Sequence, residues 1–170
     1  MGTLYLVATP IGNLEDISLR ALRILKEAVL IAAEDTRQTL KLLQRFEIHT
    51  PAISYHEHNK ISRVDDILNA LASGDVALVS DAGMPGLNDP GYELVGAALR
   101  NGNTVSVVPG ASAPVAALVI SGLPTDAFTY LGYLPRKGSE RRQRLPKWPV
   151  CPIPSFSWRP RIACARHLRI

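Results

Sequence analysis

The sequence predicts an α/β protein with a mostly parallel sheet of about five strands, flanked by helices. Short apolar runs alternate with amphipathic helical patterns through the first 135 residues. The apolar runs are continuous, as in strands that are buried on both faces. Glycine and proline follow several of these runs and mark the connecting loops. This alternation is typical of parallel strands joined by helical crossovers.

The elements follow one another in a regular order. Segment 62–72 illustrates the helical pattern, because Val64, Ile67, Leu68 and Leu71 fall on one face. Strands are expected at residues 4–8, 29–33, 52–55, 76–80, 104–108 and 127–134. Helices are expected at residues 18–27, 36–46, 62–72, 91–100 and 112–121.

Composition excludes several classes of protein. The 170 residues are 46% hydrophobic and 20% charged, which excludes a disordered chain. No apolar run approaches the roughly 18–20 residues of a membrane span, and no secretory signal is visible at the N-terminus. Two cysteines are too few for a disulfide scaffold and lack metal-ligand partners at a recognised spacing. We therefore expect a cytoplasmic protein with no membrane contact and no metal site.

Charged residues are distributed unevenly along the chain. Residues 1–145 hold 14 of the 19 Lys and Arg and all 15 Asp and Glu, whereas residues 146–170 hold five Lys and Arg and no acid. We expect an N-terminal domain at 1–135, a basic linker at 136–145 and a separate tail at 146–170.

Ligand sites in parallel sheets lie at the carboxyl ends of the strands. The first such loop, Thr-Pro-Ile-Gly-Asn-Leu at residues 9–14, is a rigid turn without the glycine fingerprint of a dinucleotide site or the lysine of a P-loop. The second, Glu-Asp-Thr-Arg at 34–37, has the pattern of a helix cap, with a polar cluster at the sheet edge as the alternative.

The loop at residues 80–91 is the most informative, with three glycines, two prolines and two aspartates. Small residues there allow a ligand to approach the backbone, and Pro90 suits the first turn of the following helix. The loop at 109–113 places small residues at a helix start, where free N–H groups favour an anion.

These motifs together resemble the tetrapyrrole methylase superfamily. They are LYLVATPIGNLED at 4–16, AAEDTR at 32–37, the loop at 79–91 and VVPGASA at 107–113, and the resemblance covers residues 3 to about 145. It is greatest to the members that use S-adenosylmethionine to methylate a cytidine ribose 2′-hydroxyl in 16S rRNA of the 30S subunit. Met84 stands where the family usually has Thr.

The resemblance implies specific residue roles. Cofactor contacts are implied at Pro10 and Ile11 in the first loop, at Asp81, Ala82, Gly83 and Met84 in the second, and at Ser112 and Ala113 in the third. A carboxylate is expected to take the 2′-hydroxyl proton, with Glu34, Asp35 and Asp81 as candidates. RNA phosphates are expected at Arg37, Arg136, Lys137, Arg141 and Arg142, although the stretch from Arg136 equally fits a solvated linker. The intact family members are expected to be homodimers.

After Leu145 the resemblance stops. The family continues into a second α/β domain that completes the cofactor cleft, whereas residues 146–170 contain five prolines and no helix or strand period. Codons read one nucleotide earlier permit a family-like strand, so we expect an out-of-frame tail and a missing C-terminal domain. An inactive single-domain remnant and a methylase of small tetrapyrroles are therefore alternatives. A nucleotide-binding Rossmann domain is disfavoured by the absent fingerprint.

Overall fold

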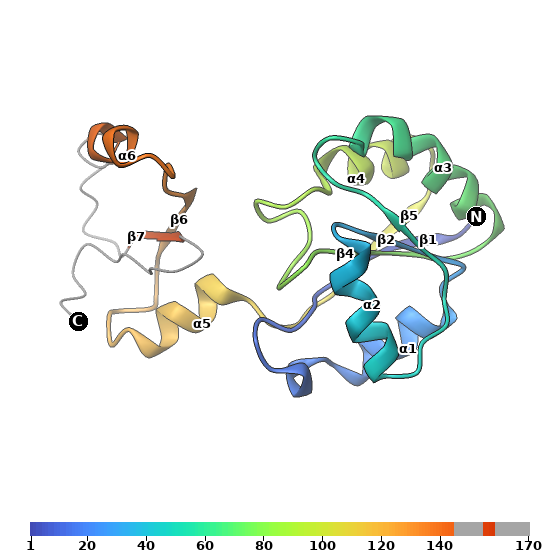
Figure 1. The fold of residues 1–170 in the computed structure, drawn as a ribbon, viewed down its shortest axis with the longest axis horizontal. Coiled ribbons are helices and arrows are strands. Elements are labelled where there is room, and N and C mark those ends of the chain that lie inside the picture. The colour runs from blue at the N-terminus through green and yellow to red at the C-terminus, as the bar shows by residue number, and fades with distance from the viewer. Residues whose placement is uncertain (145–154, 159–170) are drawn as a thin grey trace. The chain divides into compact units, whose positions relative to one another are not determined.

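The computed structural model describes residues 1–144 and 155–158. The chain divides into two compact units, Met1–Ser112 and Ala113–Ile170. Figure 1 shows the elements of both units along the chain. Within the described residues, no helix combines the length and the apolar character that crossing a bilayer requires.

A five-stranded parallel sheet forms the centre of the first unit. Its strands lie in the order β3-β2-β4-β1-β5, and every neighbouring pair is parallel. Their carboxyl ends therefore share one edge of the sheet, which confirms the predicted fold class and the predicted grouping of the loops. The strands are β1 (Thr3–Val7), β2 (Leu30–Ala33), β3 (Ala52–Ser54), β4 (Val76–Val79) and β5 (Thr104–Val108).

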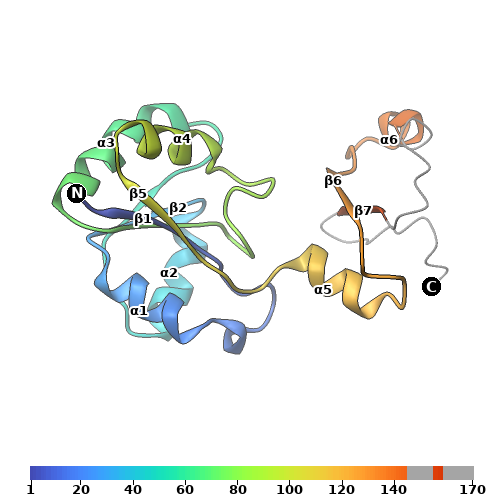
Figure 2. The ribbon, with the colours of Figure 1, turned by 180° about the vertical axis from the view of Figure 1, so that it is seen from behind.

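Helices cover both faces of this sheet (Figures 1 and 2). One face packs against α1 (Leu19–Glu27) and α2 (Thr36–Arg45), and the other packs against α3 (Lys60–Ser73) and α4 (Tyr92–Arg100). Strand β4 is buried throughout and supplies alternate residues to the two cores. Ala77 and Val79 point to the first face, and Val76 and Leu78 to the second.

The second unit contains α5 (Ala113–Ile120), β6 (Thr129–Tyr133), α6 (Gly138–Arg144) and β7 (Ser155–Trp158). The strand expected to close the main series is β6, but it pairs in parallel with β7 rather than with the five-stranded sheet. The unit that holds the sheet thus ends at Ser112, whereas the sequence placed the end of the N-terminal domain at residue 135.

Two elements lie where the sequence predicted none. Helix α6 occupies the expected linker, with Glu140 in its first turn and arginines in its last, a distribution that complements the helix dipole. Strand β7 occupies a proline-free stretch with two aromatic residues, a composition that suits a strand. The other residues of the expected out-of-frame tail at 146–170 lie outside the described part of the chain.

Helix α4 begins one residue after the start that the sequence predicted for the segment at 91–100. The helix begins at Tyr92 with Gly91 as its N-cap, so Pro90 precedes the helix. A helix that began at Pro90 would use Asp89 as its cap, but the Asp89 carboxylate instead accepts a hydrogen bond from the Ser80 hydroxyl.

Truncation of the central strand tests the packing of this unit. Because Leu78 is 1% exposed in β4, we expect Leu78→Ala to lower the free energy of unfolding by about 2–5 kcal/mol. The matched control is Leu99→Ala on α4, where the side chain is 58% exposed and the expected change is within about 0.5 kcal/mol. Urea unfolding measures both variants, and equal losses would contradict the packing described.

Candidate functional site

The loop after β4 is joined to the loop after β1. The Thr9 N–H donates to the Gly83 carbonyl at 2.9 Å, and the Gly83 N–H donates to the Thr9 carbonyl at 3.0 Å. The buried Thr9 hydroxyl also donates to the Ser80 carbonyl at 3.0 Å. Gly83 has a φ of +84°, a left-handed conformation that glycine adopts without strain. These bonds fix the position of the β4 loop beside Pro10 and Ile11.

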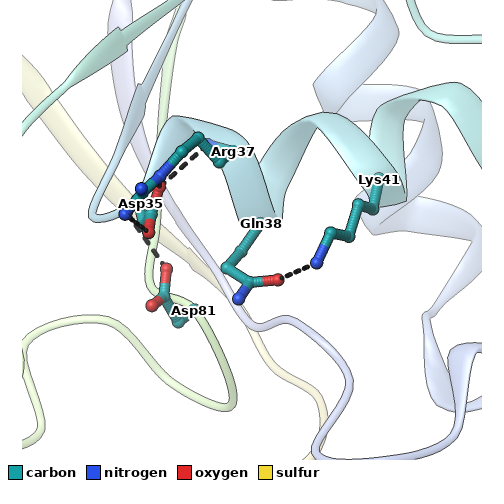
Figure 3. Close-up of polar contacts among 5 residues, drawn as sticks. All are labelled: Asp35, Arg37, Gln38, Lys41 and Asp81. Carbon is teal, nitrogen blue, oxygen red and sulfur yellow. Dashed lines mark hydrogen bonds and ion pairs between the residues drawn. The ribbon is translucent and has the colours of Figure 1, made fainter.

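The same loop is joined to the loop after β2 on its other side. The Asp35 N–H donates to Asp81 Oδ1 at 3.0 Å (Figure 3), and the Asp81 N–H donates to Glu34 Oε2 at 3.2 Å. The Glu34 N–H continues the ladder by donating to the Val79 carbonyl at 3.2 Å. The three predicted catalytic carboxylates therefore lie together, and those of Glu34 and Asp81 each accept a backbone hydrogen bond from the neighbouring loop.

Asp35 begins α2 as its N-cap. Its Oδ1 accepts the Arg37 N–H at 2.9 Å, which confirms the helix-cap interpretation. The Arg37 guanidinium also binds both carboxylate oxygens, at 3.0 and 2.8 Å. The side-chain and backbone hydrogen bonds from Arg37 lower the pKa of Asp35 to about 2. Asp35 is consequently a fixed anion, whereas the other carboxylates of the cluster titrate at higher pH.

Burial raises the pKa of three neighbouring carboxyl groups. It is the main cause for Glu34 and for Asp81, and the charge of Asp35 contributes to both. Burial, with a further contribution from the Glu34 charge, raises the pKa of Asp89 to about 6. The Ser80 hydroxyl opposes this rise by its hydrogen bond to Asp89. The cluster thus holds carboxyl groups with raised pKa beside one that remains ionised.

The loop after β5 lies beside the exits of β1 and β4. A Cβ on Gly110 would lie 3.0 Å from the Ala8 Cβ, so the loop after β5 closely approaches the β1 exit. A Cβ on Gly83 would lie 3.7 Å from the Ala111 carbonyl oxygen. The loops after β1, β4 and β5 are therefore contiguous up to Ser112, where the first unit ends and Ala113 begins the second.

A pocket of about 420 Å³ opens between the β1 exit and α2. Gln38 and Lys41 lie on the helix side, where the Lys41 ammonium donates to Gln38 Oε1 at 2.8 Å (Figure 3). The lining residues are Thr9, Pro10, Leu14, Gln38, Thr39, Lys41, Leu42, Ser80 and Asp81. The pocket thus combines an apolar wall with an amide, an ammonium and a carboxylate.

The predicted RNA-binding residues fall into different units. Arg37 belongs to the first unit and is 86% exposed despite its ion pair with Asp35. Arg136, Lys137, Arg141 and Arg142 belong to the second, in or just before α6. Lys137 lies 3.6 Å from a carboxylate oxygen of Glu140.

Comparison with known proteins identifies the family. The profile described as Tetrapyrrole (Corrin/Porphyrin) Methylases matches residues 3–151. The chain belongs to the tetrapyrrole methylase family. Nowhere in the described residues of this family member do three His, Cys, Asp or Glu side chains gather as metal ligands.

Two curated family members are similar over most of the chain. Both are called ribosomal RNA small subunit methyltransferase I. The protein from Halalkalibacterium halodurans is 59% identical over 145 residues, which are 85% of this chain and 50% of that protein. The protein from Synechocystis sp. is 55% identical over 146 residues, 85% of this chain and 52% of its own length. The chain spans about half the length of the curated relatives it matches.

A solved family structure has the same fold. It is uroporphyrin-III C-methyl transferase from Thermus thermophilus in complex with S-adenyl homocysteine. The two chains are 26% identical with a TM-score of 0.57, and the match covers 79% of this chain and 60% of the other.

Sequence reasoning missed Ser80, Asp89 and the α2 side of the pocket. The excess of aspartate in the loop at 80–91 was a signal for Asp89, but its hydrogen bond with Ser80 depends on how the loop folds back. Gln38 and Lys41 carried no signal, because polar residues on an exposed helix face are ordinary.

The raised pKa of Asp89 makes stability depend on pH. The folded state holds this proton up to about pH 6 and the unfolded state loses it near 3.8, so Asp89 lowers the free energy of unfolding as pH rises between these values. We expect Asp89→Asn to gain stability relative to the parent chain across that interval. Urea unfolding across the interval measures this, and a constant Asp89→Asn difference would contradict the assignment.

Proposed function

We propose that this chain supplies the N-terminal half of an S-adenosylmethionine-dependent enzyme that methylates the ribose 2′-hydroxyl of a cytidine in 16S rRNA of the 30S subunit. The relatives called ribosomal RNA small subunit methyltransferase I support an rRNA substrate. The solved family structure with S-adenyl homocysteine supports the cofactor. The observation that carries the proposal is the contiguity of three strand-exit loops beside a cluster of carboxylates.

The cofactor is assigned to these three loops, at residues 10–11, 81–84 and 112–113. The Thr9–Gly83 bridge and the close approach of Gly110 to Ala8 support this assignment, because they expose backbone and small side chains on one surface. A compact ligand suits such a surface, because Ala82 and Ser112 carry small side chains while Ile11 and Met84 offer apolar contacts.

The reaction needs positioning and one proton acceptor. The ribose 2′-oxygen attacks the methyl carbon of the sulfonium, a carbon–oxygen bond forms, the carbon–sulfur bond breaks, and S-adenosylhomocysteine leaves. Holding the two reactants in line supplies much of the rate. We assign the 2′-hydroxyl proton to Asp81, which lines the pocket and has a raised pKa. Glu34 and Asp35 hold Asp81 in place through the backbone hydrogen bonds on either side of it.

A methylase of small tetrapyrroles is the second candidate, favoured by the likeness to a uroporphyrin-III methyltransferase. The RNA substrate is preferred because the relatives called rRNA methyltransferases share 55–59% of their residues with this chain, against 26% for the porphyrin enzyme.

A hybrid protein tests the activity. Residues 1–145 are joined to the C-terminal half of the Halalkalibacterium halodurans relative, and methyl transfer from labelled S-adenosylmethionine is measured on 30S subunits and on uroporphyrinogen. We expect the hybrid to label a cytidine ribose in 16S rRNA, and the 170-residue chain alone to label little, because the relatives are about twice as long as the match. Labelling of uroporphyrinogen instead would contradict the RNA assignment.

Substitution of the proposed base tests the mechanism in the same hybrid. We expect Asp81→Asn to lower kcat by about 10²–10⁴-fold, because the amide cannot accept the proton. The control Asp65→Asn changes an exposed aspartate on α3 and should leave kcat unchanged. Full activity of Asp81→Asn would show that Asp81 is not the proton acceptor.

A further inference from the structure

The pocket between the β1 exit and α2 has a composition that suits a nucleotide. Pro10, Leu14 and Leu42 give it an apolar wall, against which the flat face of a base can lie. Its volume of about 420 Å³ lies within the range of small-molecule sites, roughly 300–1,000 Å³. The lining residues all belong to the first unit. The first unit therefore supplies every lining residue that the structure shows.

The polar groups of the pocket match the remaining parts of a nucleotide. The Gln38 amide carries a donor and an acceptor side by side, as a base edge requires, and its oxygen already accepts one hydrogen bond from Lys41. The Lys41 ammonium, 2.8 Å from the Gln38 carbonyl oxygen, offers a cation for a phosphate. Asp81 lies on the opposite wall, next to the loops assigned to the cofactor. Figure 3 shows Gln38 and Lys41 on the side of α2 toward the Asp81 loop.

The surface of α2 extends this cationic character away from the pocket. Arg45 lies one turn beyond Lys41, and both side chains are exposed. Their i, i+4 spacing sets them about 6 Å apart along the helix, comparable to the separation of neighbouring phosphates on a strand. The helix contains no acidic residue between its cap and Arg45. A single strand that runs along α2 thus meets positive charge outside the pocket.

We propose that this pocket receives the target cytidine of a single-stranded RNA segment, with Gln38 reading the base edge and Lys41 and Arg45 binding the flanking phosphates. This inference rests on the proposed function, because it places the acceptor 2′-hydroxyl beside Asp81 and the cofactor loops. A flipped or unpaired base is required, since only its exposed edge and face can enter such a pocket.

RNA binding by the full 170-residue chain tests the pocket without any methyl transfer. The probes are a fluorescein-labelled short single-stranded RNA with one central cytidine and its uridine counterpart, followed by anisotropy at several salt concentrations. We expect the cytidine RNA to bind about tenfold tighter than the uridine RNA, and Gln38→Ala to abolish this preference. Lys41→Ala should weaken both RNAs about equally and reduce the salt slope by about 1.

Matched controls use exposed residues outside the pocket. Gln44→Ala on α2 and Lys26→Ala on α1 should leave base preference and salt slope at the values of the parent chain. Equal behaviour of Gln38→Ala and Gln44→Ala, or no RNA binding by the parent chain, would overturn the proposal. The methyl-transfer assay separates the two claims. If the hybrid methylates 30S subunits but Gln38→Ala and Lys41→Ala bind RNA as the parent chain does, only the assignment of the pocket is overturned. If the two variants lose RNA binding as expected but the hybrid does not methylate 30S subunits, only the proposed function is overturned.

Discussion

Backbone hydrogen bonds on both sides of the β4 exit hold the candidate site together. On one side Thr9 and Gly83 exchange N–H···O bonds, and on the other Asp35 and Asp81 are linked through a carboxylate. Strand β4 lies between β2 and β1 in the sheet, so its loop can contact the loops after both of these strands. Displacing this loop would separate the carboxylates from the loops assigned to the cofactor.

The environment gives chemically identical groups different roles. Asp35 accepts the Arg37 backbone N–H and guanidinium and therefore remains charged, which suits a helix cap rather than a proton acceptor. For Asp81 and Asp89 desolvation is the largest cause and outweighs the interactions that lower the pKa, so each holds its proton to higher pH. Among the carboxyl groups with raised pKa, Asp81 is the proton acceptor that we propose.

Local pattern predicted the first unit well. Strand β5 and the capped start of α2 lie where apolar runs and the Asp-Thr pair placed them, because such features depend on residues next to each other in the chain. The partner of β6 was not predictable in this way, because it depends on β7 more than twenty residues away. The same holds for the site residues. The loops carried motifs that could be recognised in the sequence, whereas Gln38 and Lys41 became candidates only because they line the pocket in the structure.

The central claim is that the exits of β1, β4 and β5 form the cofactor surface of this chain. Hydrogen–deuterium exchange with and without S-adenosylhomocysteine tests it most directly, because the amides of these loops report contact without requiring turnover. The account predicts slower exchange concentrated at residues 9–12, 81–84 and 110–113, with the amides of α3 unchanged. Slower exchange confined to other segments, or none at all, would contradict it.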